Sequence, residues 1–157
     1  MATLKIRKFS TIEEAQFFLN GGIIGGAAKT AGGVYGLVGL TLTFTSPNAA
    51  VTFVAGADLT NLTLTWAELK TQIETAVTGV RVQAFGPDGG VGFIETTPTN
   101  GVALSSNNET AKRILGFPQS GAVVGKVYKT PTTNTAPCLV AIYPDVQSNS
   151  HVVVTWE

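Results

Sequence analysis

The alternation of apolar and polar residues along the chain predicts that most of it is β-strand. From Leu40 to Thr45, leucine and phenylalanine alternate with threonine, and a period of two is typical of a strand with one buried face. Turn signals at Ser46-Pro-Asn48 and at Gly86-Pro-Asp-Gly-Gly90 separate neighbouring strands and predict hairpins. Further strands are expected at residues 3–9, 50–55, 80–84, 91–96, 102–105, 122–129, 138–143 and 151–156. The sheet should therefore be mainly antiparallel.

Two to three short helices interrupt these strands. Ser10-Thr-Ile-Glu13 and Thr65-Trp-Ala-Glu68 each have the spacing of a capping box, in which a hydroxyl and a carboxylate satisfy free amides at a helix start. The first helix should end near Leu19, before Asn20-Gly-Gly22, and the second at Gly79. A third should be capped by Asn107 or Asn108 and should carry Ala111, Ile114 and Leu115. Strands and separate helices together predict an α+β fold.

A glycine-rich, apolar segment at residues 21–39 divides the chain in two. We expect residues 1–39 to form an N-terminal strand, a helix and a glycine-rich N-terminal arm, and residues 40–157 to form a β-rich core domain. Ordering glycine costs more backbone entropy than ordering other residues. The segment is therefore either an arm that packs on a neighbouring molecule or a pair of glycine-rich turns inside the domain.

Composition and charge narrow the function classes. Hydrophobic residues make up 44% of the 157 residues and charged residues only 13%, against roughly 25% in typical soluble domains. Ten basic and ten acidic residues balance, and the densest basic cluster is Lys5, Arg7 and Lys8. Nucleic-acid binders usually carry a basic stripe, so no nucleic-acid partner is expected. Glycines and Lys29 interrupt the most apolar stretch, 23–40, so no membrane span is expected either.

Residues suited to catalysis are few. Cys138 is the single cysteine and His151 the single histidine, so neither an intramolecular disulfide nor a cysteine metal cluster can form. The chain contains no Gly-x-Ser-x-Gly motif. Glycine runs before Lys29 and Lys126 depart from the phosphate-binding loop pattern. We therefore expect no enzyme activity, no cofactor and no metal; the alternative is a small hydrolase that uses His151.

Residues 39–117 carry a resemblance to a known class of proteins. Leu-Thr-Leu-Thr-Phe at 40–44, the Thr-Trp-Ala-Glu-Leu-Lys helix start at 65–70, the Gly-Val-Arg-Val strand at 79–82 and Ile-Leu-Gly-Phe at 114–117 occur in this order. The order resembles domains of tailed-bacteriophage virion proteins, including tail-sheath proteins, and insertions in flagellar proteins. These families have no catalytic residues to transfer.

The resemblance implies a structural virion protein that assembles in the host cytoplasm. Its partners would be identical subunits and other virion proteins, in a ring, tube or shell layer, with a neck or tail component favoured. A capsid decoration or cement protein is the alternative within this class, and a carbohydrate- or receptor-binding module is the alternative outside it.

Aromatic and aliphatic anchors on a weakly charged surface are typical of buried protein contacts. The C-terminal strand at 151–156 could in addition extend the sheet of a neighbour. The candidate oligomer interface consists of Phe17, Phe18, Ile23, Ile24, Tyr35 and Trp156.

Overall fold

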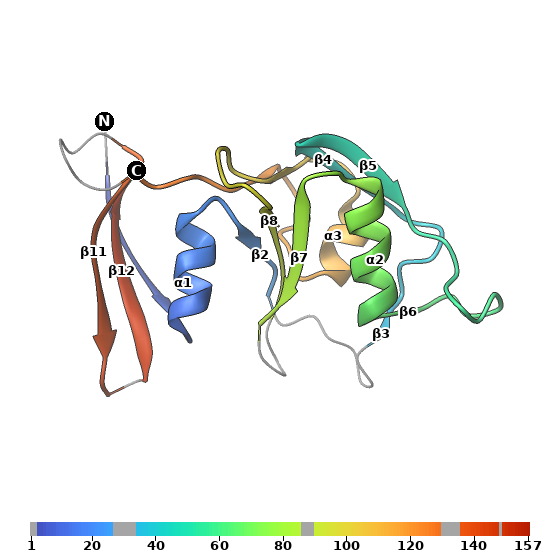
Figure 1. Ribbon diagram of the computed structural model, residues 1–157, viewed down its shortest axis with the longest axis horizontal. Coiled ribbons are helices and arrows are strands. Elements are labelled where there is room, and N and C mark those ends of the chain that lie inside the picture. Colours follow the sequence, from blue (N-terminus) through green and yellow to red (C-terminus); the bar gives the residue numbers. More distant parts are fainter. Residues whose placement is uncertain (1–2, 27–33, 86–89, 130–135, 148) are drawn as a thin grey trace.

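A computed structural model describes residues 3–26, 34–85, 90–129, 136–147 and 149–157. Figure 1 shows an elongated molecule in which sheets and helices follow one another along the long axis. Several antiparallel sheets and three short helices confirm the predicted α+β class. Of the glycine-rich segment, residues 27–33 lie outside the described part. So do residues 86–89 of the predicted glycine turn and 130–135 of the polar loop.

The sheet at one end of the molecule joins the two ends of the chain. It has the order β1–β12–β11, and these strands span Leu4–Phe9, Ser150–Trp156 and Cys138–Asp145. Both strand pairs are antiparallel, with a bulge between Leu139 and Ala141. Strand β12 therefore lies in the centre of its sheet, which corrects the expectation that it is a free edge, because both of its backbone sides are already paired.

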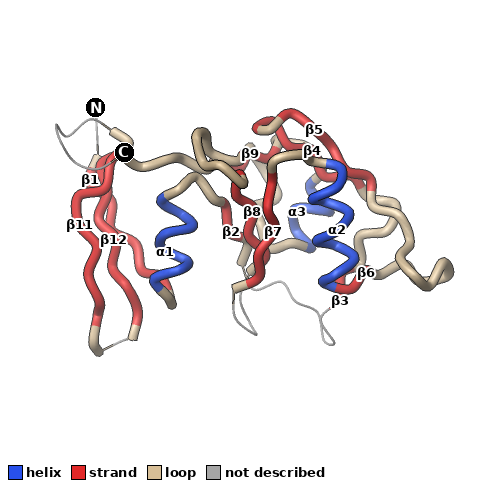
Figure 2. Tube along the Cα trace, in the orientation of Figure 1, coloured by secondary structure: helices blue, strands red, loops and turns tan. Residues whose placement is uncertain are grey.

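Helix α1 (Ile12–Leu19) lies between this sheet and the middle of the molecule (Figures 1 and 2). Ala15 and Leu19 pack against Val153 of β12. The opposite side of α1 presents Phe17, whose ring meets Phe85 edge-on with 4.9 Å between ring centroids. Because apolar residues occur on both sides of α1, the helix joins two separate cores.

The middle and the far end share the largest core. The middle sheet is β2–β8–β7, spanning Ile23–Ile24, Val91–Glu95 and Val80–Ala84. The far sheet is β10–β9–β4–β5, spanning Val123–Val124, Ala103–Leu104, Thr41–Ser46 and Asn48–Thr52. A small sheet pairs β3 (Val34–Tyr35) with β6 (Leu64–Thr65). Helices α2 (Trp66–Ala76) and α3 (Glu109–Ile114) pack between them.

Of the three predicted helix starts, that of α2 is confirmed in full, and those of α1 and α3 differ in detail. Thr65 and Glu68 form the full capping box expected for α2. Helix α1 is capped one residue later than predicted: the Thr11 hydroxyl, and not that of Ser10, accepts from the Glu14 amide at 3.2 Å. Asn108 precedes α3 as expected but makes no side-chain cap, because its φ of 63° is left-handed.

Glycines from distant parts of the chain allow backbone segments to cross closely. A Cβ on Gly101 would lie 1.8 Å from the carbonyl oxygen of Gly125, and one on Gly125 would lie 2.2 Å from that of Gly21. Val102 bridges the crossing, donating to Gly21 at 2.9 Å and accepting from Gly125 at 2.8 Å. Farther along, Gly26 donates to the carbonyl of Gly116 at 2.8 Å. In the described residues, the glycines at 21–26 therefore serve contacts inside the subunit.

Strand pairs cross the predicted domain boundary at residue 39. Strand β1 pairs with the C-terminal β12, β2 pairs with β8, and β3 pairs with β6. The described residues of 1–39 are therefore built into the same sheets as residues 40–157. Helices α1, α2 and α3 have 8, 11 and 6 residues, and none of the helices in the described ranges has the length and apolar character needed to cross a membrane.

Candidate interaction surface

One face of the terminal sheet is apolar and faces solvent. Residues directly opposite each other on antiparallel strands point to the same side, and side chains alternate along each strand. Phe9, Val153 and Ile142 contact α1, so the residues between them lie on the other side of the sheet. We call this side the outer face, and it carries Leu4, Ile6, Ala141, Tyr143, Val154 and Trp156.

Large apolar side chains of the outer face are exposed. Ile6 is 66% exposed, Tyr143 50% and Leu4 48%. Trp156 and Val154 are partly buried. Val152 and Cys138 lie in the same rows as Tyr143 and Trp156 and are buried, at 6% and 1% exposure. Among the described residues of the three strands, the charges on this side are Lys8, in the row of Tyr143, and Asp145, in the next row on the same side, and they pair with each other at 3.0 Å. Contiguous exposed apolar residues with a polar rim are typical of protein interaction sites.

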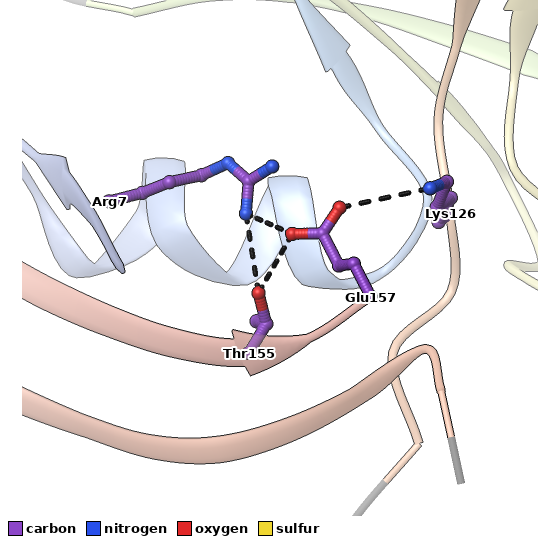
Figure 3. A network of polar contacts seen from close by, with 4 residues as sticks. All are labelled: Arg7, Lys126, Thr155 and Glu157. Carbon is purple, nitrogen blue, oxygen red and sulfur yellow. Dashed lines mark hydrogen bonds and ion pairs between the residues drawn. The ribbon is translucent and has the colours of Figure 1, made fainter. Parts of the chain in front are cut away.

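A carboxylate network holds β1 and β12 together on the side facing α1 (Figure 3). Glu157 forms an ion pair with Arg7 of β1 and accepts a hydrogen bond of 2.9 Å from the Thr155 hydroxyl. Arg7 also donates to that hydroxyl at 3.2 Å, and its guanidinium lies 4.8 Å from the centre of the Phe18 ring. Lys126 approaches the other carboxylate oxygen at 3.7 Å. This network ties the connection before β11 to the sheet.

The network shifts two pKa values. Burial alone would raise the pKa of Glu157, but hydrogen bonds from Arg7 and Thr155 and the charge of Arg7 outweigh it and lower the pKa to about 2. The Tyr128 ring stacks on Phe18, with centroids 5.2 Å apart. Burial, together with the charge of Glu157, raises the pKa of the Tyr128 hydroxyl to about 12. At neutral pH the carboxylate is therefore ionised and the phenol protonated.

The lowered pKa of Glu157 predicts acid sensitivity. A carboxyl whose folded pKa lies below its unfolded value, here 4.5, stabilises the fold above the unfolded pKa. That contribution should be lost as the pH falls from about 5 through about 2. Because the Glu157 side chain is only 6% exposed, we expect about 1–3 kcal/mol. Urea unfolding across this pH range should show a smaller decline in Glu157→Gln than in the wild-type protein, and equal declines would contradict the assignment.

The six predicted interface residues occupy different environments. Phe17, Ile23 and Tyr35 are 5%, 5% and 0% exposed and belong to the cores. The structure therefore corrects their assignment as surface anchors, because the subunit itself already covers them. Ile24 is partly buried against Phe17, and Phe18 is partly buried between Phe9 and Tyr128. Of the six, Trp156 lies on the outer face.

Sequence reasoning missed Leu4, Ile6 and Tyr143 as surface residues. The alternation in β1 separates Leu4 and Ile6 from Lys5 and Arg7, and an apolar side normally faces the core. In the structure the sides are reversed, since Arg7 faces α1 and covers the Phe18 ring. Alternation identifies the apolar side of a strand, but it does not say whether the same chain covers that side.

His151 and the carboxylates Asp58 and Glu68 lie in different parts of the described chain. His151 lies in the strand row between Phe9 and Pro144, and its buried Nδ1 has no hydrogen-bond partner there. No cluster of three potential metal ligands occurs in the described part of the chain. A hollow of about 390 Å³ beside the start of α2 is lined by Asp58 and Glu68, among others. Thr60 donates to the first carboxylate, and the amides of Ala57 and Thr65 donate to the second.

Comparisons with known proteins found no relative of this chain. No family model matches the chain, and no similar protein was found among curated proteins or among solved structures.

Proposed function

We propose that the protein is a structural subunit of a tailed-phage particle that assembles with identical copies into a ring, tube or shell layer, with the neck or tail favoured. The observation that carries the proposal is the outer face, where Ile6, Tyr143 and Leu4 are about half exposed or more. Exposing such side chains to water is unfavourable, at roughly 25 cal/mol for each Å² of apolar surface. Contact with a second subunit removes this cost.

The virion context rests on the resemblance of residues 39–117, together with the low charge of the chain. A surface with 13% charged residues and zero net charge provides little repulsion between copies. Identical subunits and other virion proteins are the partners of this proposal, and the virion, assembled in the host cytoplasm, is its location. The role is structural and does not require a catalytic centre.

A single substitution on the outer face tests the proposal. Ile6→Asp introduces a charge at a 66% exposed position, so the fold should persist while association weakens. Removing one buried aliphatic contact and desolvating a carboxylate should raise the dissociation constant at least about tenfold. Sedimentation velocity over a range of concentrations measures this change.

Val124→Asp is the matched control. Val124 is 60% exposed on β10, in a different sheet, and the variant should assemble like the wild-type protein. A wild-type chain that stays monomeric at every concentration, alone and with the other virion proteins, would rule the proposal out. Equal effects of the two variants would show that the outer face has no special role.

A further inference from the structure

Strand β1 forms one edge of the terminal sheet and turns part of its backbone toward solvent. Thr3 and Glu157 exchange two hydrogen bonds, at 2.6 and 2.8 Å, and such bonded pairs alternate with unbonded pairs along an antiparallel ladder. The residues of β1 that bond to β12 are therefore Lys5, Arg7 and Phe9. The residues whose N–H and C=O groups point away from β12 are Leu4, Ile6 and Lys8. No segment of the described chain pairs with this outward row.

Two other edge strands are interrupted or covered. On the other edge of the terminal sheet, β11 is interrupted by its bulge and contains Pro144, which has no amide hydrogen. At the edge of the middle sheet, the Val82 amide of β7 donates to Glu74 of α2 at 2.8 Å, and Lys70 donates to the Val82 carbonyl at 3.0 Å. Strand β1 contains no proline, and its register with β12 is unbroken over six residues. It is therefore well suited to accept a further strand.

Charged side chains normally guard an exposed strand edge against pairing, but two of the three cations of β1 are turned back over their own sheet. Arg7 pairs with Glu157 on the side facing α1 (Figure 3). Lys8 pairs with Asp145 of β11, two strands away, on the outer face. The third cation, Lys5, is exposed on the side facing α1 and has no ion pair among the described residues. One positive charge without a partner in the described chain therefore lies beside the open edge.

From these observations we propose that the β1 edge binds an extended segment of another protein chain as a fourth, antiparallel strand. A row of free N–H and C=O groups is matched by a backbone in the same extended form, and antiparallel pairing is the more stable kind. Side chains directly opposite each other lie on the same face. The segment therefore carries apolar residues opposite Leu4 and Ile6, which are 48% and 66% exposed, and an acidic residue between them, opposite Lys5.

A second copy of β1 is a poorer match for this edge. Two β1 strands paired about Ile6 would place Lys5 of one copy opposite Arg7 of the other, and like charges directly opposite each other are unfavourable. A segment with an acidic residue between two apolar ones complements both the charge and the apolar side chains of the edge. The inference thus adds a second kind of partner to the proposed function and does not depend on contacts between identical copies.

Synthetic peptides test strand addition on the full-length protein. The probe is a fluorescein-labelled peptide of sequence Thr-Val-Glu-Val-Glu-Val-Thr, and fluorescence anisotropy should give a dissociation constant below about 1 mM. Methylation of the valine nitrogens should weaken binding at least about tenfold, because these nitrogens donate to β1 when valine lies opposite Leu4 and Ile6. Methylation of the glutamate nitrogens is the matched control and should change binding little, because these nitrogens point away from β1.

Variants of the protein test the position and the charge of the contact. Lys5→Glu should weaken binding of this peptide about tenfold and strengthen binding of the analogue with lysine in place of glutamate. Arg113→Glu makes the same charge change on α3 and should do neither. Saturation with the peptide should slow hydrogen exchange at the outward amides of β1, whereas the Arg7 amide, already bonded to β12, should be unchanged. The amides that should slow are those of Leu4, Ile6 and Lys8.

Other outcomes overturn the inference. The β1 edge is not a strand-binding site if the valine–glutamate peptide fails to bind up to about 1 mM, if the two methylation patterns have equal effects, or if exchange slows elsewhere than at the three outward amides. If these amides become protected in concentrated protein without peptide, the occupant is a second copy and the assigned partner is wrong. The proposed function is judged separately, by the self-association of Ile6→Asp and Val124→Asp.

Discussion

Replacing Gly101 with alanine should destabilise the fold by about 3–5 kcal/mol, a large part of the 5–15 kcal/mol that stabilises a typical domain. The added Cβ would lie 1.8 Å from the carbonyl oxygen of Gly125 and 2.3 Å from its carbonyl carbon. Both atoms belong to the backbone, so no side chain can rotate away. Separating the strands would strain or break the hydrogen bonds that Val102 makes to Gly21 and Gly125.

Gly36→Ala is the matched control for this prediction. A Cβ at Gly36 meets nothing within 4 Å, and the residue does not adopt a left-handed φ. Its replacement should leave stability within about 1 kcal/mol of wild type, with a slight gain from the less flexible unfolded chain. Equilibrium unfolding in urea measures both variants. Similar midpoints for Gly101→Ala and Gly36→Ala would contradict the backbone crossing.

Replacing Lys112 with alanine should cost a similar amount, about 3–5 kcal/mol. Lys112 is fully buried in α3, and its Nζ donates to the carbonyl of Ser105 at 3.0 Å and to that of Gly121 at 2.9 Å. Alanine would leave two carbonyls without their donor, at about 1–3 kcal/mol each, and would open a cavity where the aliphatic stem packs. The loop after α3 should loosen first, because Gly121 belongs to it.

Two further variants separate the loss of the hydrogen-bond donor from the loss of side-chain volume at position 112. Lys112→Met keeps most of the volume and removes the donor, so its loss should lie between those of wild type and alanine. Arg113→Ala changes the next, exposed residue of the same helix and should cost no more than about 0.5 kcal/mol. Thermal unfolding by calorimetry compares all three. If Lys112→Ala were as stable as Arg113→Ala, the buried Lys112 side chain would not hold the loop.

Local patterns allowed most elements to be predicted. Period-two alternation located β4 and β12, and the Thr65–Glu68 capping box located the start of α2. These signals are reliable because they depend on a few consecutive residues. The neighbouring hydroxyls of Ser10 and Thr11 show the limit: the spacing pointed to Ser10, whereas Thr11 caps α1 in the structure.

The candidate surface was predicted less well. Phe17, Ile23 and Tyr35 have the residue types of interface anchors, yet they are buried within the subunit. Ile6 and Tyr143 have the residue types of core positions, yet they face solvent. The same apolar side chain suits both environments, so residue type alone cannot separate a core from a contact.

The α+β class, the positions of most strands and helices, and the weak surface charge could all be predicted from the amino-acid sequence, because each depends on composition or on local spacing. Three other features became visible in the folded chain: β1 pairs with β12 from the other end of the chain, glycines 21, 101 and 125 meet at one crossing, and the apolar side of β1 stays exposed. Each of these depends on contacts between distant segments. Such contacts are chosen by the packing of the whole chain, and no local pattern of residues encodes them.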